Sequence, residues 1–385
     1  MEAFSITQPF DFMKVVFQIS GIWTGQKGWP FLYKVYAVLV QTFLFFAFGI
    51  SMCINLASIK NIEDITESFY MTLTIILMLI KILNLVVRSG NLLQFLEGVN
   101  SPLIEPETDG ELEMFKIAYS SFNRQRNFLL VCGWSCILSA LYASAFGDGD
   151  KLPYPGWFPF DWKHNQKYFW IAYSYQVFAM GLSCTTNVST DLTGGYLSFQ
   201  VSIFFRLVSR RLAAIGNSRR DGELFPDEKT IHALVRCIEM HQLVTRLAED
   251  IQTILSVPYF IQFNVSGIVI CFTAFQLALL SPVADSGTFS LFFFFMICIL
   301  IQNYLPCYYG NEVIVASDLV STALYSSNWP ELPLPYKKLV CYFMERLKKP
   351  TIIKAGGYFT IGLNTLTSII QSAYSFFALI INLEN

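Results

Sequence analysis

The chain has 385 residues, of which 54% are hydrophobic, 16% aromatic and only 14% charged. Soluble domains carry about 25% charged residues, so this composition excludes a soluble globular protein and indicates an integral membrane protein. The formal net charge of −2 does not favour nucleic acid as a partner. Residues 1–23 lack the basic and then apolar pattern of a cleavable signal peptide, so we expect the first membrane helix to direct insertion.

Seven apolar stretches are long enough to cross a bilayer at about 1.5 Å per residue. In chain order they cover residues 35–59, 68–87, 128–146, 168–191, 257–280, 288–309 and 355–383. We therefore predict an all-α membrane protein with seven transmembrane helices. The last stretch carries no charge but contains small and polar residues, which favours a helix that faces protein or water more than lipid. Because only Glu384 and Asn385 follow it, we expect no cytoplasmic tail.

Lys and Arg residues predict the direction of these helices, since they gather on the cytoplasmic side. With the N-terminus inside, the outer connections hold only Lys60, Lys151, Lys163 and Lys167, and the inner connections hold nearly all the others. The predicted topology therefore has a cytoplasmic N-terminus and an extracellular C-terminus. G-protein-coupled receptors have the opposite arrangement.

Apolar patterns continue beyond three of the predicted spans. After Asp191 the pattern runs to Ile215 with three arginines interleaved, and residues 231–251 and 339–347 are amphipathic. Cytosolic helices with apolar faces must bury them, so we expect a compact intracellular bundle or a subunit interface.

These patterns divide the chain into six segments. They are a cytoplasmic N-terminal segment (1–34), transmembrane helices 1–4 (35–205) with an outer loop (147–167), cytosolic helical extensions (206–256), transmembrane helices 5 and 6 (257–309), a cytosolic anchor segment (310–354) and a seventh, pore-lining helix (355–383).

Three regions resemble the insect odorant receptors. The outer loop reads KLPYPGWFPFD from Lys151 to Asp161, and CIEMH runs from Cys237 to His241. The C-terminal part carries YYGNE from Tyr308, ALYSSNW from Ala323, Lys349-Pro350, Ala355-Gly-Gly and Tyr374-Ser375. Many ligand-specific members have Ser where this chain has Ala373. This difference weakens any role assigned to a hydroxyl group at that position.

The resemblance implies a subunit of an odorant-gated cation channel in the plasma membrane of olfactory sensory neuron dendrites. A ligand-specific (tuning) receptor would assemble with a common co-receptor into a heterotetramer, and the last helix of each subunit would line the pore. Cytosolic helices would hold the subunits together. The terminal motif is similar to that of a tuning receptor rather than the co-receptor. The alternatives are a gustatory-type receptor channel and a G-protein-coupled receptor.

By this resemblance the narrow, apolar gate aligns with one face near the outer end of the last helix, and a hydrophobic ring there would block ions by dewetting. From the residues alone, interhelical or lipid-facing packing is the more common role of such a face. The candidates for the pore and gate are Gln371, Tyr374, Phe377, Ile380 and Ile381.

A site for a small volatile ligand should be aromatic-lined with few polar groups, and an aromatic or heteroaromatic odorant would stack there. Aromatic stripes are more often plain packing. The candidates at helical spacing in the outer half are Tyr70, Leu73, Ser139, Tyr142, Tyr173, Gln176, Met180, Phe275 and Phe292. The tip from Trp157 to Phe160 would form a lid over this pocket or dip into the membrane interface.

Two isolated charges lie within the predicted spans. Lys81 is expected to snorkel to the cytosolic interface, and the alternative is a buried charge coupled to the ligand or the gate. Asp191 is expected to cap or pair near the inner boundary. The three histidines are not spaced with Asp, Glu or Cys as metal ligands are, and no nucleotide-binding or hydrolase motif is present. We expect no cofactor and no enzymatic activity.

Overall fold

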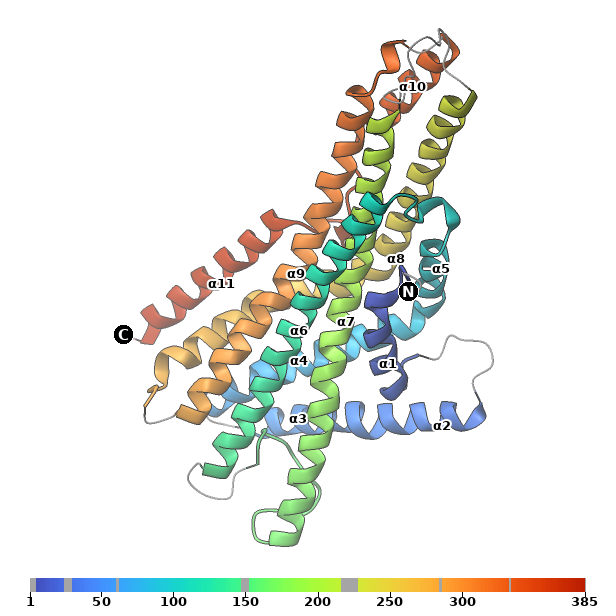
Figure 1. Ribbon diagram of the computed structural model, residues 1–385. Helices are drawn as coiled ribbons and strands as arrows, with labels where there is room; N and C mark the ends of the chain where they lie inside the picture. The colour runs from blue at the N-terminus through green and yellow to red at the C-terminus, as the bar shows by residue number, and fades with distance from the viewer. Residues whose placement is uncertain are drawn as a thin grey trace.

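The computed structural model describes residues 5–23, 30–59, 62–146, 152–215, 228–283, 286–331 and 334–384, and these residues are almost entirely helical (Figure 1). The α-helices are α1 (Asp11–Ile19), α2 (Phe31–Val40), α3 (Ala47–Ser58), α4 (Ile62–Val87), α5 (Ser89–Val99), α6 (Asp109–Phe146), α7 (Gln166–Ala214), α8 (Glu228–Leu279), α9 (Ser286–Tyr325), α10 (Leu334–Leu347) and α11 (Leu363–Glu384). A π-helical segment, Gln41–Phe46, joins α2 to α3. Short 3₁₀ turns cover Gln8–Phe10, Pro102–Ile104 and Trp329–Glu331, and the strands are β1 (Lys354–Ala355) and β2 (Phe359–Thr360).

Six helices of the described part are long and apolar enough to cross a membrane. They are Phe31–Ser58, Ser68–Val87, Asp109–Ala145, Thr230–Leu279, Ser286–Tyr325 and Leu363–Ile380. The predicted fourth span, 168–191, lies within α7. It is not among the six because α7 is rich in hydroxyl and amide side chains from Ser183 to Thr193. These polar groups are largely buried, because α7 runs through the bundle and packs most extensively on α9.

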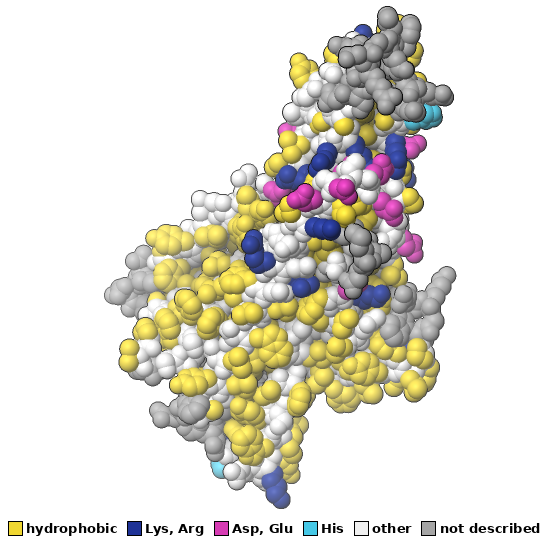
Figure 2. Space-filling model, viewed as in Figure 1, with side chains coloured by type: hydrophobic (Ala, Val, Ile, Leu, Met, Phe, Trp, Pro, Cys, Tyr) yellow, Lys and Arg dark blue, Asp and Glu magenta, His cyan; other side chains and the backbone are white. Residues whose placement is uncertain are grey.

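The predicted helical extensions are continuations of the membrane helices. In Figure 1, α6, α7, α8 and α9 run as long rods toward α10 at one end of the molecule. Figure 2 shows hydrophobic side chains over the other part of the bundle, whereas Lys, Arg, Asp and Glu gather over the α10 half. We call this charged half, with α10 and the adjoining ends of α6 to α9, the extension region. The amphipathic segments 231–251 and 339–347 lie in α8 and α10, which form part of this region.

Ion pairs and the CIEMH segment stabilise the extension region. The guanidinium of Arg211 on α7 lies 2.9 Å from the Glu111 carboxylate at the start of α6. His241 packs between the rings of Phe205 and Phe343, with centroid distances of 5.7 and 5.3 Å. Arg211 also donates to the sulfur of Met240 at 3.4 Å. The motif therefore forms part of a buried core that joins α7, α8 and α10.

A β-hairpin precedes the last helix, so α11 begins at Leu363 rather than at Ala355. Lys354 pairs with Thr360 and Ala355 with Phe359. Gly356 and Gly357 make the turn at positive φ, 61° and 77°, where a side chain is strained. The apolar sequence alone predicted one continuous helix from residue 355. Glycines are also typical of helix–helix interfaces in membranes, so Gly356 and Gly357 did not by themselves indicate a turn.

Hydrogen bonds fix the hairpin to α8. The side chain of Gln252 accepts from the Lys354 amide and donates to its carbonyl, both at 2.6 Å. The Gly356 amide donates to the Ser256 carbonyl at 2.9 Å, and the ring of Phe260 stacks on Phe359 at 5.9 Å. The hairpin thus places the start of α11 relative to α8 and α9.

Candidate functional site

Aromatic side chains from α4 and α9 meet in the part of the bundle away from the extension region. After the predicted topology we call this group, together with Tyr154, the outer cluster. The ring of Tyr70 lies 5.0 Å from that of Phe292 and 4.8 Å from that of Phe295. Both Tyr70 and Phe292 are almost fully buried. Helical spacing in the sequence predicted the meeting of Tyr70 with Phe292, but it did not identify Phe295.

The segment between α6 and α7 enters this cluster through Tyr154. The side-chain amide of Gln176 accepts from the Tyr154 amide at 3.2 Å and donates to its carbonyl at 2.9 Å. This clamp places the Tyr154 ring inside the bundle, where it is 2% exposed. Among the residues that the structure describes, its hydroxyl has no hydrogen-bond partner. A buried hydroxyl without a partner is costly, so this group is available to a ligand.

The tip of the same segment folds over the end of the bundle. Ser51 on α3 donates to the Trp157 carbonyl at 2.6 Å, and the Trp157 amide donates to the Ser51 carbonyl at 3.1 Å. Phe158 packs edge-on against Tyr175 of α7, with ring centroids 6.1 Å apart. Of the two alternatives for this tip, these contacts favour a lid.

Of the predicted binding residues, the structure brings Tyr70 against Phe292 and Gln176 against Tyr154, and the others differ in burial. Met180 and Ser139 are buried, and Leu73 is half-buried against the core. Tyr173 accepts a hydrogen bond from Ser144 at 3.4 Å. Tyr142, in contrast, is half exposed and lies beside Gly287, and Phe275 is half-buried outside the main core cluster. Tyr154 was missed, although its aromatic ring in a motif-bearing loop was the available signal.

Two cysteines join α6 to α9 beside the cluster. The sulfurs of Cys136 and Cys298 lie 3.8 Å apart, and both side chains are buried. Cys136 is one helical turn from Ser139. The thiols therefore form part of the packing around the same site.

A buried ion pair lies deeper in the bundle, between α4 and α7. The ammonium of Lys81 is 2.5 Å from a carboxylate oxygen of Asp191 and 3.5 Å from the amide oxygen of Asn187. Because Lys81 is only 8% exposed, its expected snorkelling to an interface is wrong. Asp191 pairs as predicted. Its second oxygen and the Tyr259 hydroxyl on α8 have no hydrogen-bond partner within the described part of the chain.

Helix α11 has one covered face and one open face. Ile369 and Ala373 are buried against the bundle, and Phe377 and Ile380, half-buried, follow them at helical spacing. On the opposite side Gln371 and Tyr374 are exposed, Tyr374 to 70%. Ile381 lies in the helix, but its side chain is outside the described part of the structure.

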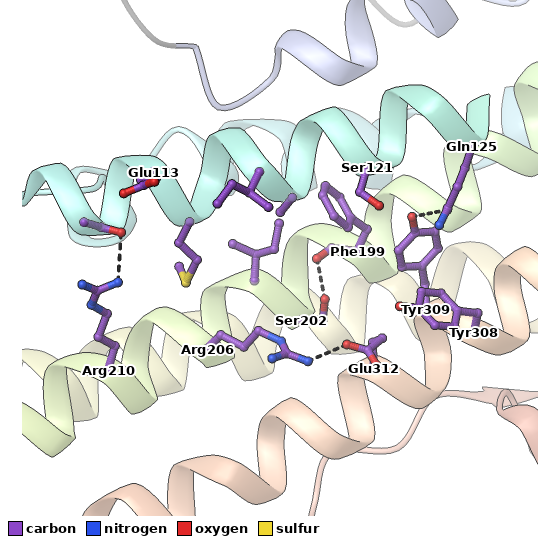
Figure 3. A pocket seen from close by; sticks show the side chains of 15 residues that line it. Glu113, Ser121, Gln125, Phe199, Ser202, Arg206, Arg210, Tyr308, Tyr309 and Glu312 are labelled. Atoms are coloured by element: carbon purple, nitrogen blue, oxygen red, sulfur yellow. Dashed lines mark hydrogen bonds and ion pairs between the residues drawn. The ribbon is translucent and has the colours of Figure 1, made fainter. Parts of the chain in front are cut away.

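In the part of the chain that the structure describes, no group of three or more His, Cys, Asp or Glu side chains is placed to hold a metal ion. A pocket between α6, α7 and α9 lies toward the extension region (Figure 3), and none of the predicted site residues line it. The chemistry available at the outer cluster is therefore apolar contact, ring stacking and a few hydrogen bonds.

Comparison with known proteins identifies the fold and the family. Residues 61–374 match the family model described as 7tm Odorant receptor. Odorant receptor 94a of Drosophila melanogaster is 29% identical over 379 residues, covering 96% of each chain, and odorant receptor 2a of that species is 25% identical over 384 residues, covering 95% of this chain and 94% of its own.

The solved structure of the olfactory receptor OR5 from the insect Machilis hrabei has a similar fold, with a TM-score of 0.85 and 17% identity over 98% of both chains. A second structure shows OR5 in complex with eugenol, with the same TM-score and coverage. The family model covers most of this chain, and the two Drosophila receptors named above match it along nearly their whole length. The chain therefore belongs to the insect odorant receptor family and is not an enzyme.

Proposed function

We propose that this chain is the ligand-specific subunit of an odorant-gated, non-selective cation channel, with its odorant site at the outer cluster around Tyr154. The observation that carries the proposal is the buried Tyr154 hydroxyl, which has no hydrogen-bond partner among the described residues, on a segment that Gln176 holds inside the bundle. A small volatile ligand with one hydrogen-bond acceptor satisfies this hydroxyl while its apolar part meets aromatic faces. The complex of OR5 with eugenol supports a site for such a ligand in this fold.

The channel part of the proposal rests on α11. Its exposed face, with Gln371 and Tyr374, is uncovered in the single chain and would form a shared pore with the co-receptor in a heterotetramer. Phe377, Ile380 and Ile381 stay the predicted gate. Alanine substitutions on the half-buried and the exposed face of α11 distinguish which of the two faces lines the pore. If Phe377→Ala raises the resting current, the gate includes the half-buried face; if only Tyr374→Ala changes ion selectivity, the pore wall lies on the exposed face.

We place the extension region in the cytoplasm and the outer cluster toward the extracellular side of the plasma membrane, with the N-terminus inside. The Lys and Arg side chains over the extension region (Figure 2) support this orientation. A C-terminal tag should then be reached by antibody on intact cells. Staining that needs permeabilised cells would reverse the orientation.

The odorant site is tested with Tyr154→Phe, which removes only the hydroxyl. One hydrogen bond contributes about 0.5–1.5 kcal/mol net, so the EC50 of an activating odorant that accepts this bond should rise about 2- to 13-fold. Tyr168→Phe is the matched control, because Tyr168 is on the same helix as Gln176 but is exposed. An unchanged EC50 in Tyr154→Phe for every activating odorant, including those with an acceptor, would remove Tyr154 from the site.

A further inference from the structure

A pocket of about 510 Å³ lies between α6, α7 and α9 (Figure 3), and no residue of the outer cluster lines it. Residues of α7 form its floor, and α6 and α9 form its two walls, as the close-up shows. The lining combines apolar side chains, two tyrosines and four charges. The residues that the argument uses are Met114, Ile117, Ala118, Arg206, Tyr308 and Glu312.

The pocket lies where the apolar part of the bundle meets the extension region. Gln125 precedes the third predicted span by three residues, and Tyr309 ends the sixth. A hydrogen bond from the Tyr309 hydroxyl to Gln125 joins α9 to α6 at this level. Glu312 is one helical turn further along α9, about 4.5 Å at 1.5 Å per residue. A polar headgroup layer is roughly 5–7 Å thick on each side of the hydrocarbon core, so Glu312 lies at headgroup depth.

Both signs of charge are available at this depth. A guanidinium nitrogen of Arg206 lies 2.6 Å from a carboxylate oxygen of Glu312, and the two side chains are 41% and 23% exposed. Further from the membrane, Arg210 donates to the Gly110 carbonyl at 2.9 Å, and Glu113 is exposed on the same wall. Two cations therefore face two carboxylates around the pocket. This balance suits a ligand that carries one phosphate and one ammonium more than a purely anionic one, because Glu312 would repel the latter.

An apolar track connects the pocket with the membrane. Ile117 on the α6 wall is 64% exposed, and Phe128 and Val131, at 56% and 64%, follow it on the same helical face three and four turns later. Met114 and Ala118 continue the apolar surface into the pocket. A chain of methylene groups fits such a track, since exposed apolar surface at this depth is covered by lipid.

We propose that this pocket binds the headgroup of a zwitterionic phospholipid from the cytoplasmic leaflet. The phosphate accepts hydrogen bonds from Arg206, the ammonium group binds Glu312, and an acyl chain lies along the α6 track. The site is separate from the odorant site and does not depend on it. It gives the leaflet a direct contact with α9, the helix that also packs on α11.

Photocrosslinking in nanodiscs tests the proposal with the full-length chain. The bulk lipid is phosphatidylglycerol, and the probe is a trace of photoactivatable phosphatidylethanolamine or, in a parallel sample, photoactivatable phosphatidylglycerol. Mass spectrometry then locates the labelled peptides. We expect phosphatidylethanolamine to label peptides containing Met114–Gln125 or Tyr308–Glu312. Labelling there should fall at least fivefold in Glu312→Gln and in Arg206→Gln.

Two further variants keep the result interpretable. Lys116→Gln is the matched control, because Lys116 is exposed on α6 but does not line the pocket, and it should leave labelling unchanged. Ala118→Trp fills the pocket without altering a charge and should abolish labelling. Equal labelling by both lipids, labelling that survives Ala118→Trp, or crosslinks from this pocket to a second receptor chain in place of lipid would each overturn the proposal.

Discussion

The buried ion pair between Lys81 and Asp191 makes a quantitative prediction. Asp191→Asn keeps the size of the side chain but leaves the Lys81 ammonium charged, buried and without a carboxylate 2.5 Å away. Breaking a buried pair on one side costs about 3–5 kcal/mol. The unfolding entropy of a chain of 385 residues is roughly 0.8 kcal/mol/K at the average value per residue. The melting temperature should therefore fall by about 4–6 °C.

The assay is thermal unfolding of the solubilised full chain, followed by fluorescence-detected size exclusion. Asp161→Asn is the matched control: Asp161 pairs with His164 but is exposed in the outer segment, and such pairs contribute little. The double variant Lys81→Met/Asp191→Asn removes both charges and should recover at least half of the loss, because no unpaired charge remains. A melting temperature unchanged in Asp191→Asn, or a double variant as unstable as the single one, would refute the reasoning.

Three other predictions concern packing, pH and redox chemistry. Gly310→Ala should destabilise the chain by about 1–3 kcal/mol, because the added Cβ would collide with the Ile361 carbonyl. Gly362→Ala is the control in the same thermal assay, because a Cβ there would meet Asn311 and Thr360 only at ordinary van der Waals distance, 4.0 Å; equal losses would contradict the contact. Burial, and to a smaller extent Arg346, lowers the pKa of His241 to about 4, below the unfolded value of about 6.5, so His241 is neutral in the fold. The contribution of neutral His241 to the free energy of unfolding should be complete above about pH 6.5 and should decline as the pH falls toward 4, by at most about 3 kcal/mol. Between pH 7 and 5 the melting temperature of His241→Phe should therefore fall less than that of the unmodified chain. An identical fall would argue against a neutral His241. Finally, a thiol oxidant should join Cys136 to Cys298, whose sulfurs are 3.8 Å apart, and mass spectrometry of peptides from the unfolded, alkylated chain should find the linked pair, whereas two alkylated cysteines would indicate that the helices do not approach further.

The positions of the long helices were predictable because apolar length and periodicity determine them directly. The span 68–87 and the continuation of residues 231–251 into the fifth span both agree with α4 and α8. The hairpin before α11 was not predictable from hydropathy, because its glycines lie inside an apolar run. Only the contacts with α8, such as those of Gln252, show why the chain turns there.

The site was predictable to the extent that it lies on helices. Spacing on α4 and α9 predicted that Tyr70 and Phe292 would be near each other, but it gave no information on Tyr154, which enters from a connecting segment held by Gln176. Lys81 was misassigned for a related reason. A charge one helix away from its partner carries no local signal of the pairing, and only the packing of α4 against α7 brings Asp191 within reach.

The central claim is that this chain supplies the odorant specificity of a shared cation channel. The most direct measurement is whole-cell current during an odorant panel, with this chain, an insect co-receptor, or both expressed in cells that lack other odorant receptors. The account predicts an odorant-evoked, non-selective cation current only when both are present, with the response to acceptor-bearing odorants weakened by Tyr154→Phe. An equal odorant-evoked current from either chain expressed alone, or a response that requires a G protein, would contradict it.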